Sequence, residues 1–224
     1  FTLNRLCGSG LQAIISASQQ IQTGDVETAI AGGAECMSHS MYWVPAMRWG
    51  QRMNDGTVID AMVGALSDPF DDVPMGITAE NVAEKWEITR EEQDALAVQS
   101  HQRAAKAIAE GYFKEQIMPI EIKERKSVRI FDTDEFVRAD SSVEALSKLR
   151  PVFKENGTVT AGNASGVNDA AAAVVLMNRE AAEKQGLKPM ARLVAYSCVG
   201  VDPRYMGIGP IPAIQSVLER ANLT

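Results

Sequence analysis

The first pattern in the chain is a helical spacing of apolar residues between residues 11 and 23. This spacing predicts an amphipathic helix, and Gly24 follows it as a typical C-terminal stop. Residues 27–34 (ETAIAGGA) are typical of a short buried strand that runs into a glycine turn. Because the chain also opens on residues typical of the tail of a strand, the order strand, helix, strand predicts a βαβ unit and a parallel sheet. The apolar positions of the helix are Leu11, Ile14, Ile15 and Ile21.

This periodicity is lost between residues 37 and 70. Five methionines, two tryptophans and several glycines fall there without regular spacing. A stretch this long and this apolar does not behave as a free linker. We expect either an inserted subdomain or a surface that a partner subunit covers. The apolar and aromatic residues 41–53 in particular predict an interface between copies of the protein.

Helical signals return at residue 78. Thr78 begins a helical segment, and residues 89–92 (TREE) form a capping box that opens a long helix ending near Gly111. Residues 117–138 alternate apolar and polar side chains, which predicts one or two strands. Basic residues cluster in that region of an otherwise acidic protein, at Lys123, Arg125, Lys126 and Arg129.

The last third of the chain alternates strand and helix signals. Residues 158–166 (TVTAGNASG) predict a strand entering a glycine-rich turn, and residues 170–177 (AAAAVVLM) predict a buried strand or helix-strand element. Residues 178–186 predict a short polar helix and residues 191–201 a further strand. Residues 211–221 predict an amphipathic helix. Strands that alternate with helices in this way indicate an α/β fold.

Composition narrows the function classes. Asp and Glu outnumber Lys and Arg by 29 to 22, and the net charge of −7 argues against nucleic acid as a general partner. No apolar run approaches the ~18 residues of a membrane span, so we expect no membrane partner. The three cysteines, Cys7, Cys36 and Cys198, are widely spaced. That spacing excludes a disulfide framework and a thiolate zinc site, and it favours a reducing, cytoplasmic compartment.

Cys7 carries the most informative chemistry. It stands within residues 4–13 (NRLCGSGLQA), where a loop enters the predicted helix. Unpaired N–H groups and the positive end of the dipole favour an anion at a helix N-terminus. The small residues after Cys7 let another molecule approach closely. A thiolate in that place can act as the nucleophile of acyl transfer.

Two other interpretations of this segment stay open at this point. Most free cysteines are small hydrophobes buried in the core. Gly8, Gly10 and Ala13 also fit the glycine pattern of a dinucleotide-binding fold. That pattern needs an acidic residue at the end of the following strand, and Glu35 is the only candidate.

The ordered motifs of the whole chain resemble those of the thiolases. The subgroup that they resemble most is the acetyl-CoA acetyltransferase and broad-range β-ketothiolase branch. The resemblance implies a layered αβαβα fold with an inserted loop domain, and acyl transfer between CoA and a 3-ketoacyl-CoA through an acyl-cysteine intermediate. The motifs that carry it are residues 4–13, 31–38 (AGGAECMS), 75–81 (MGITAEN), 148–151 (KLRP), 157–166 (GTVTAGNASG) and 207–210 (GIGP).

The resemblance implies roles for individual residues. Cys7 would take up the acyl group as a thioester, and its backbone N–H would supply part of the oxyanion hole. Ala161 and Ser165 would contact the pantetheine arm of CoA, and Arg138 would lie against the nucleotide end. CoA and acyl-CoA are then substrates, with no permanently bound cofactor, no metal, and a homodimer or homotetramer as the assembly. The residues implied to line the acyl and pantetheine tunnel are Leu66, Met75 and Phe153.

From composition and pattern alone, Arg138 would be a solvated loop arginine and the three apolar residues would be core packing. Three positions also depart from the family pattern. Pro74 stands where acetyl-specific members often carry a histidine, so short-chain specificity is not implied. Ala145 replaces a serine that is common at the position facing CoA, and Cys36 replaces another serine.

The later motifs of the family do not occur in the chain. These are an Asn-Glu-Ala-Phe motif, a Gly-His-Pro histidine that activates the nucleophile, and a Cys-Gly-Gly cysteine that acts as acid and base. His39 and His101 are the only histidines, and neither lies in such a motif. The chain also begins at Phe1 and not at methionine. We therefore expect a fragment that is incomplete for catalysis.

The resemblance also implies a domain plan. Residues 1–36 and 157–178 would belong to the N-terminal α/β repeat, residues 37–156 to an inserted CoA-binding loop domain, and residues 179–224 to the start of the C-terminal repeat. Two other function classes stay open. A ketoacyl synthase would share the fold and a nucleophilic cysteine but act on a carrier-protein thioester. A non-catalytic acyl-CoA-binding protein would need no activating histidine.

Overall fold

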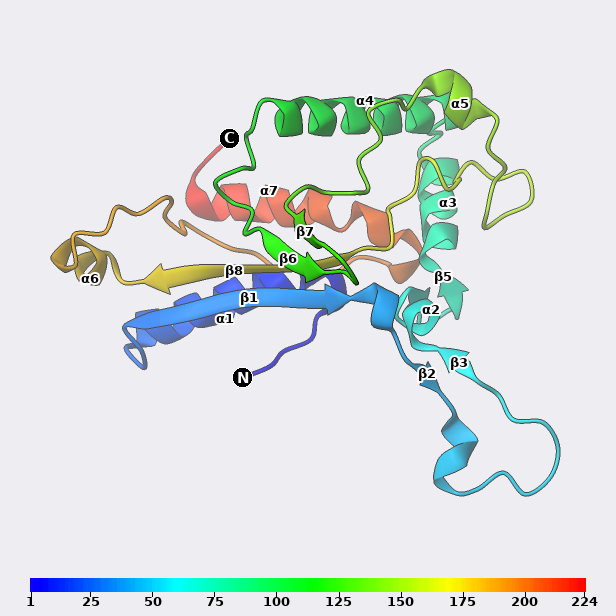
Figure 1. Ribbon diagram of the computed structural model, residues 1–224, viewed down its shortest axis with the longest axis horizontal. Coiled ribbons are helices and arrows are strands. Elements are labelled where there is room, and N and C mark those ends of the chain that lie inside the picture. The colour runs from blue at the N-terminus through cyan, green and yellow to red at the C-terminus, as the bar shows by residue number, and fades with distance from the viewer. The chain divides into compact units, whose positions relative to one another are not determined.

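The computed structural model describes residues 1–224, which form two compact units with mixed helices and strands (Figure 1). The first unit comprises Phe1–Asp72 and Val167–Thr224, and the second comprises Val73–Gly166. The boundaries expected from the sequence, after residues 36, 156 and 178, do not coincide with these units. They describe the repeats of a complete protein of the family and stay a prediction.

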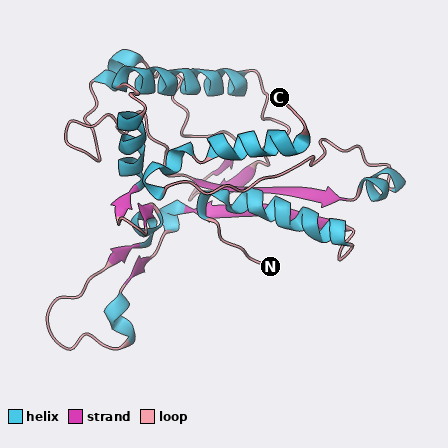
Figure 2. Ribbon diagram, turned by 180° about the vertical axis from the view of Figure 1, so that it is seen from behind, coloured by secondary structure: helices cyan, strands magenta, loops and turns pink.

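The first unit is built on a long antiparallel ribbon of two strands. β1 (Thr28–Cys36) pairs with β8 (Asp169–Met177) along the full length of both strands. α1 (Ser9–Thr23) lies along this ribbon (Figures 1 and 2). The helix ends at Gly24, whose φ of +79° is the left-handed conformation expected of a glycine stop. The buried apolar residues of these elements are Ile15, Ala17 and Ala31.

The predicted parallel βαβ unit is wrong. Residues 1–5 form no strand, and the partner of β1 is the antiparallel strand β8, far away in the sequence. Apolar periodicity specifies that a segment is a strand, but it does not specify which strand pairs with it. The predicted burial is wrong as well, because Ala31 is the only fully buried residue of β1 and β8 has none. Each strand has a single neighbour, so much of the ribbon stays exposed.

The irregular region from residue 37 onward contains only short elements. β2 and β3 pair antiparallel, and the connection between them carries exposed methionines and Trp49, which is 90% exposed. This arrangement agrees with the missing periodicity. The elements are η2 (Met37–His39), β2 (Tyr42–Trp43), η3 (Pro45–Arg48), β3 (Ile59–Asp60), α2 (Ala61–Ala65) and β4 (Ser67–Asp68).

The C-terminal part of the first unit contains α6 (Arg179–Lys184), η4 (Pro203–Ile208) and α7 (Pro210–Ala221). Both helices that the sequence predicts here are confirmed. The strand predicted over residues 191–201 does not form. Its polar groups bond to helices instead of to a neighbouring strand: the Tyr196 hydroxyl accepts from Gln19 of α1 at 2.7 Å, and Ser197 and Ser216 of α7 are hydrogen-bonded at 2.8 Å.

The second unit combines helices with a β-hairpin. The capping box is confirmed, since the Thr89 hydroxyl accepts from the Glu92 N–H and the Glu92 carboxylate accepts from the Thr89 N–H. The hairpin confirms the alternation seen over residues 117–138. The helix expected from Thr78 begins earlier, because Pro74 serves as its N-cap. The elements are β5 (Val73–Pro74), α3 (Met75–Lys85), α4 (Arg90–Ala109), β6 (Ile120–Lys123), β7 (Val128–Phe131) and α5 (Val143–Ser147).

The strand expected at residue 158 is also wrong. Only Thr160 makes a β-bridge, with Pro151, and the chain then turns through residues 161–164. Side-chain hydrogen bonds, described below, replace the ladder of a strand. No helix of the structure is both long and apolar enough to span a membrane.

Candidate active site

Cys7 lies in the tight turn η1 (Leu6–Gly8), immediately before α1. The prediction that it stands where a loop enters a helix is confirmed. Its thiol is free and exposed, so the interpretation as a buried core cysteine is wrong. The dinucleotide interpretation fails too, because it needs a strand before the turn and a parallel strand after the helix.

Local hydrogen bonds fix the turn that carries Cys7. The Ser9 hydroxyl accepts from the Arg5 N–H at 2.8 Å and donates to the Leu6 carbonyl at 2.7 Å. Leu6 has a φ of +47°, a left-handed conformation that costs a residue with a side chain about 1–2 kcal/mol. The Asn4 side chain accepts from the Leu6 N–H at 2.9 Å and supports this conformation. Backbone strain of this kind is typical of functional sites, and here it lies next to the candidate nucleophile.

Arg5 ties the same turn to two other segments of the first unit. Its guanidinium donates to Gln12 of α1 at 2.7 Å and contacts the sulfur of Cys198 at 3.0 Å. The segment before Cys7 is therefore held from the helix that follows it and from the 191–201 region. Sequence patterns do not reveal the Cys198 contact, because it joins residues almost 200 positions apart.

Leu66 is the other candidate residue of the first unit. It directly follows the short helix α2 as its C-cap and is 36% exposed. Asp60 is the N-cap of this helix, and its carboxylate accepts from the Met62 N–H at 2.9 Å. The ring of Trp43 lies over Gly64 of the same helix, 3.4 Å from where a Cβ would stand. This packing positions Leu66 from a turn of helix that is too short to be predicted from periodicity.

Met75 and Phe153 both lie in the second unit. Met75 is the first residue of α3 and is half-buried. Phe153 is 37% exposed, and its ring lies against the backbone of Gly76, the residue that follows Met75. The Phe153 ring therefore lies at the start of the helix that Met75 begins, although the sequence places the two residues in separate motifs.

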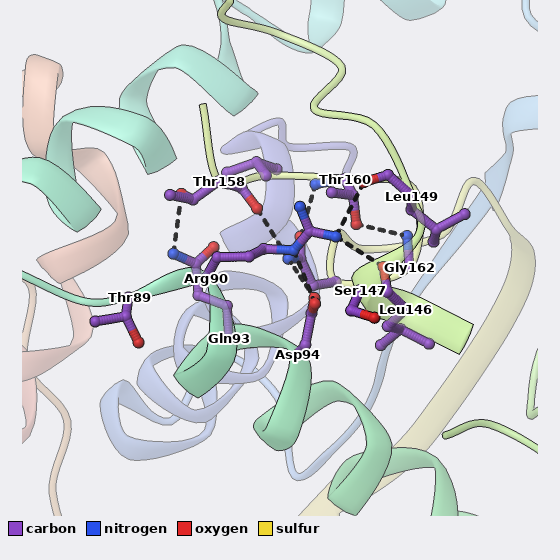
Figure 3. Close-up of polar contacts among 12 residues, drawn as sticks. Thr89, Arg90, Gln93, Asp94, Leu146, Ser147, Leu149, Thr158, Thr160 and Gly162 are labelled. Carbon is purple, nitrogen blue, oxygen red and sulfur yellow. Dashed lines mark hydrogen bonds and ion pairs between the residues drawn. The ribbon is translucent and has the colours of Figure 1, made fainter. Parts of the chain in front are cut away.

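Ala161 begins the turn of residues 161–164 in the second unit and Ser165 directly follows it; both residues are exposed. The buried carboxylate of Glu80, on α3, holds the backbone that enters this turn. It accepts from the Thr158 N–H at 2.8 Å, from the Thr158 hydroxyl at 2.9 Å and from the Val159 N–H at 2.7 Å. A second group of polar contacts, around Arg90 and Asp94 of α4, holds the rest of the turn (Figure 3).

Arg138 is exposed, and its backbone N–H donates to Nδ1 of His101 on α4 at 3.2 Å. The His101 ring also packs against Phe136, with ring centroids 5.8 Å apart. His101 therefore anchors the loop that carries Arg138, a role that its sequence position did not suggest. The other histidine, His39, is exposed in η2. No group of three or more His, Cys, Asp or Glu residues is arranged to hold a metal ion.

The supporting acids Glu80 and Asp94 were missed by sequence reasoning. Both are almost fully buried, at 4% and 1% exposed. The available signal was their position on a buried helix face: Asp94 lies one turn before the buried Val98, and Glu80 lies one turn before the buried Ala83. An acid on such a face has to meet hydrogen-bond donors from another element.

Comparison with known proteins places these motifs in a family. The model of the thiolase N-terminal domain matches residues 1–180. The β-ketothiolase BktB of Cupriavidus necator is 61% identical over 223 residues, which are 99% of this chain and 57% of that protein. The acetyl-CoA acetyltransferase of Syntrophomonas wolfei is 52% identical, over 100% of this chain and 57% of its own length. The chain thus spans a little over half the length of the curated relatives that it matches.

Solved structures agree. The acetyl-CoA acetyltransferase of Bacillus anthracis matches with a TM-score of 0.96 at 52% identity, covering 100% of this chain and 57% of that one. Human mitochondrial 3-ketoacyl-CoA thiolase in complex with CoA matches with a TM-score of 0.95 at 44% identity, covering 100% of this chain and 56% of that one. With the fold and the family model in agreement along the matched residues, this chain belongs to the thiolase family.

Proposed function

We propose that the complete protein is a thiolase in which Cys7 carries the acyl group. The observation that supports this most is the free, exposed Cys7 thiol in a strained turn at the entrance of α1, in a chain of the thiolase family. Relatives named acetyl-CoA acetyltransferase and β-ketothiolase support the same reaction type. The thiolase family model favours this over a ketoacyl synthase.

In the degradative direction the Cys7 thiolate attacks the 3-keto carbon of a 3-ketoacyl-CoA. The bond between C2 and C3 breaks, its electron pair stays on C2, and protonation of C2 releases acetyl-CoA. The thiol of a second CoA then attacks the acyl-Cys7 thioester and leaves with the acyl group, returning the thiolate. In the synthetic direction the Cys7 thiolate takes the acetyl group of one acetyl-CoA and CoA leaves. A second acetyl-CoA loses a proton from C2, and this carbanion attacks the acetyl-Cys7 carbonyl, which expels the Cys7 thiolate and gives acetoacetyl-CoA. Passing through a thioester replaces one difficult step with two easier ones.

The substrate contacts are assigned to residues as follows. The Cys7 N–H contributes to the oxyanion hole, where a fixed donor stabilises the developing negative charge. Ala161 and Ser165 contact the pantetheine arm, and Arg138 contacts the nucleotide end, where its guanidinium can both stack and pair with phosphate. CoA is a substrate in this scheme and not a resident cofactor. The residues assigned to the acyl and pantetheine tunnel are Leu66, Met75 and Phe153.

We further propose a homodimer or homotetramer in the cytoplasm, acting in fatty-acid metabolism. Exposed apolar side chains between residues 41 and 53, among them Met47 at 67% and Trp49 at 90%, support burial by another copy. Three free cysteines support a reducing compartment. Light scattering coupled to size-exclusion chromatography tests the assembly. Trp49→Ser should shift the measured mass toward that of the monomer. A wild-type protein that is already monomeric would contradict the proposal.

Intact-mass measurement after incubation with acetyl-CoA tests the central step. The full-length protein should gain one acetyl group, released by hydroxylamine as a thioester is. Cys7→Ala should abolish the adduct, whereas Cys36→Ala and Cys198→Ala, which remove the other exposed thiols, should keep it. An adduct that survives Cys7→Ala would contradict the assignment. No adduct on the wild type would favour a non-catalytic acyl-CoA-binding protein.

A further inference from the structure

Asp94 is a buried acid that the proposed reaction does not use. It lies on α4 with its residue only 1% exposed, and both carboxylate oxygens are engaged (Figure 3). Oδ2 accepts from Nε of Arg90 at 2.8 Å, one turn earlier on the same helix. Oδ1 accepts from the side-chain amide of Asn163 at 2.9 Å. A buried charge with this set of partners is either structural support or part of a functional arrangement.

The Arg90 side chain fixes the carboxylate from one side. Besides Asp94, its guanidinium donates to the carbonyl oxygens of Leu146 at 2.7 Å and Leu149 at 3.0 Å (Figure 3). Leu146 lies in the last turn of α5, and Leu149 lies just beyond its C-cap Lys148. A guanidinium held by three acceptors has little freedom, so the Asp94 carboxylate is held in one orientation.

The Asn163 side chain fixes the turn from the other side. Its oxygen accepts from the Thr160 N–H at 2.8 Å, and its amide donates to the Thr158 carbonyl at 3.0 Å. Thr160 is fully buried, and its hydroxyl accepts from the Gly162 N–H at 3.1 Å. Asn163 therefore folds the backbone from Thr158 onward into one turn, and Asp94 connects that turn to α4.

Only a carboxylate satisfies both neighbours of Asp94. Arg90 and the Asn163 amide are both donors, so the group between them has to accept twice. An amide at position 94 would point its NH₂ at one of the two donors and lose that hydrogen bond. The neutral isostere therefore breaks the double connection from Arg90 to Asn163 without changing the volume of the site.

We propose that Asp94 is a positioning residue for CoA: through Asn163 it sets the conformation of the turn that presents Ala161 and Ser165 to the pantetheine arm. This inference rests on the proposed thiolase function. According to this inference, a side chain of α4 that does not itself contact the substrate helps to determine the affinity for CoA. The acylation of Cys7 by a bound acyl-CoA does not depend on Asp94 in this scheme.

Steady-state thiolysis and CoA titration of the full-length protein test the inference. Asp94→Asn should raise the KM and Kd for CoA roughly tenfold to a hundredfold, the usual effect of losing a hydrogen bond to a charged group. The kcat and the yield of acyl-Cys7 at saturating acyl-CoA should stay near wild type. Glu91→Gln, which removes an exposed charge from the same helix, is the matched control and should change neither constant.

Asn163→Ala provides a second route to the same hydrogen bond. It should also raise the KM for CoA, and the double variant should be no worse than the poorer single variant, because both act through one connection. This keeps the test decisive if Asp94→Asn folds poorly.

The outcomes separate the two proposals. A wild type that never acylates Cys7 overturns the thiolase function. A wild type that acylates Cys7, together with variants that bind CoA as wild type does, overturns only the role of Asp94. Losses of kcat and thermal stability that saturating CoA does not restore would assign Asp94 a merely structural role and also overturn the inference.

Discussion

The ring of Phe153 occupies the space that a side chain at Gly76 would need. A Cβ built on Gly76 would lie 2.1 Å from Cδ2 and 2.3 Å from Cγ of Phe153, well inside van der Waals contact. Glycine at the second position of α3 is therefore required by an aromatic ring from another segment and not by its own backbone, since Gly76 has no left-handed φ. The close approach of the Phe153 ring to the start of α3 depends on this glycine.

Gly76→Ala should lower the free energy of unfolding by about 1–3 kcal/mol, because the added methyl group displaces the Phe153 ring. Urea unfolding measures the change. Gly56→Ala, at a glycine with open space around it, is the control and should be close to neutral. In a Phe153→Ala background the cost of Gly76→Ala should shrink. If Gly76→Ala lowers the free energy of unfolding equally with and without the Phe153 ring, the contact with the ring is not the cause of the loss.

Thr89→Ala should lower the free energy of unfolding by about 1 kcal/mol, the usual value of an N-cap. The substitution removes the acceptor for the Glu92 N–H, 3.2 Å away, at the start of a helix that carries Arg90 and Asp94. Chemical denaturation compares it with Thr57→Ala, an exposed loop threonine. If Thr89→Ala and Thr57→Ala lower the free energy of unfolding equally, the cap does not contribute to stability.

Gly162→Ala should also destabilise the protein, by about 1–3 kcal/mol, and perturb the turn that carries Ala161. Its Cβ would lie 2.6 Å from Cδ1 of Leu149 and 3.0 Å from Cγ of the buried Leu146. Because Leu149 is nearest, Leu149→Ala should absorb much of the clash. A double-mutant cycle on unfolding free energies measures this coupling, and simple additivity of the two changes would contradict it.

Ser38→Ala should lower the free energy of unfolding at neutral pH but not in strong acid. The Ser38 hydroxyl, and next its N–H at 2.9 Å, hold the pKa of Asp169 below its ordinary value of 3.8. A carboxyl with a lowered folded-state pKa stabilises the fold above its unfolded pKa. That contribution is lost as the pH falls through the folded-state pKa.

Unfolding measured from neutral pH down through the acid range checks this. The difference between wild type and Ser38→Ala should be constant near neutrality and shrink below the ordinary pKa of the carboxyl. In an Asp169→Asn background the pH dependence of the Ser38→Ala effect should vanish. A Ser38→Ala effect that stays constant into strong acid would rule out this linkage.

The helices were the most predictable part of the fold. Gly24, the capping box at Thr89 and the apolar face of residues 211–221 are local signals, and α1, α4 and α7 follow them closely. Strand partners were not predictable, because the pairing of Thr28 with Met177 depends on residues that lie far apart in the chain. The 191–201 segment has strand-like residues but is held by side-chain bonds to helices.

The position of Cys7 before α1 was equally readable, since small residues and a helical pattern follow it directly. The supporting groups were not. The roles of Glu80 and Asp94 follow from their hydrogen bonds to Thr158 and Asn163 in the folded protein. No spacing along the chain predicts these contacts. His101 likewise gains its role from a backbone N–H that arrives from residue 138.

The single pairing of β1 with β8 has a consequence for amide exchange. In an antiparallel pair each strand turns every second N–H toward its partner and the others away from it. Hydrogen–deuterium exchange along residues 28–36 should therefore alternate between slow and fast amides. Any strand that a second copy lays against the free edge would slow the fast set and erase the alternation. The exchange rates of individual amides in β1 would therefore report on assembly in the unsubstituted protein.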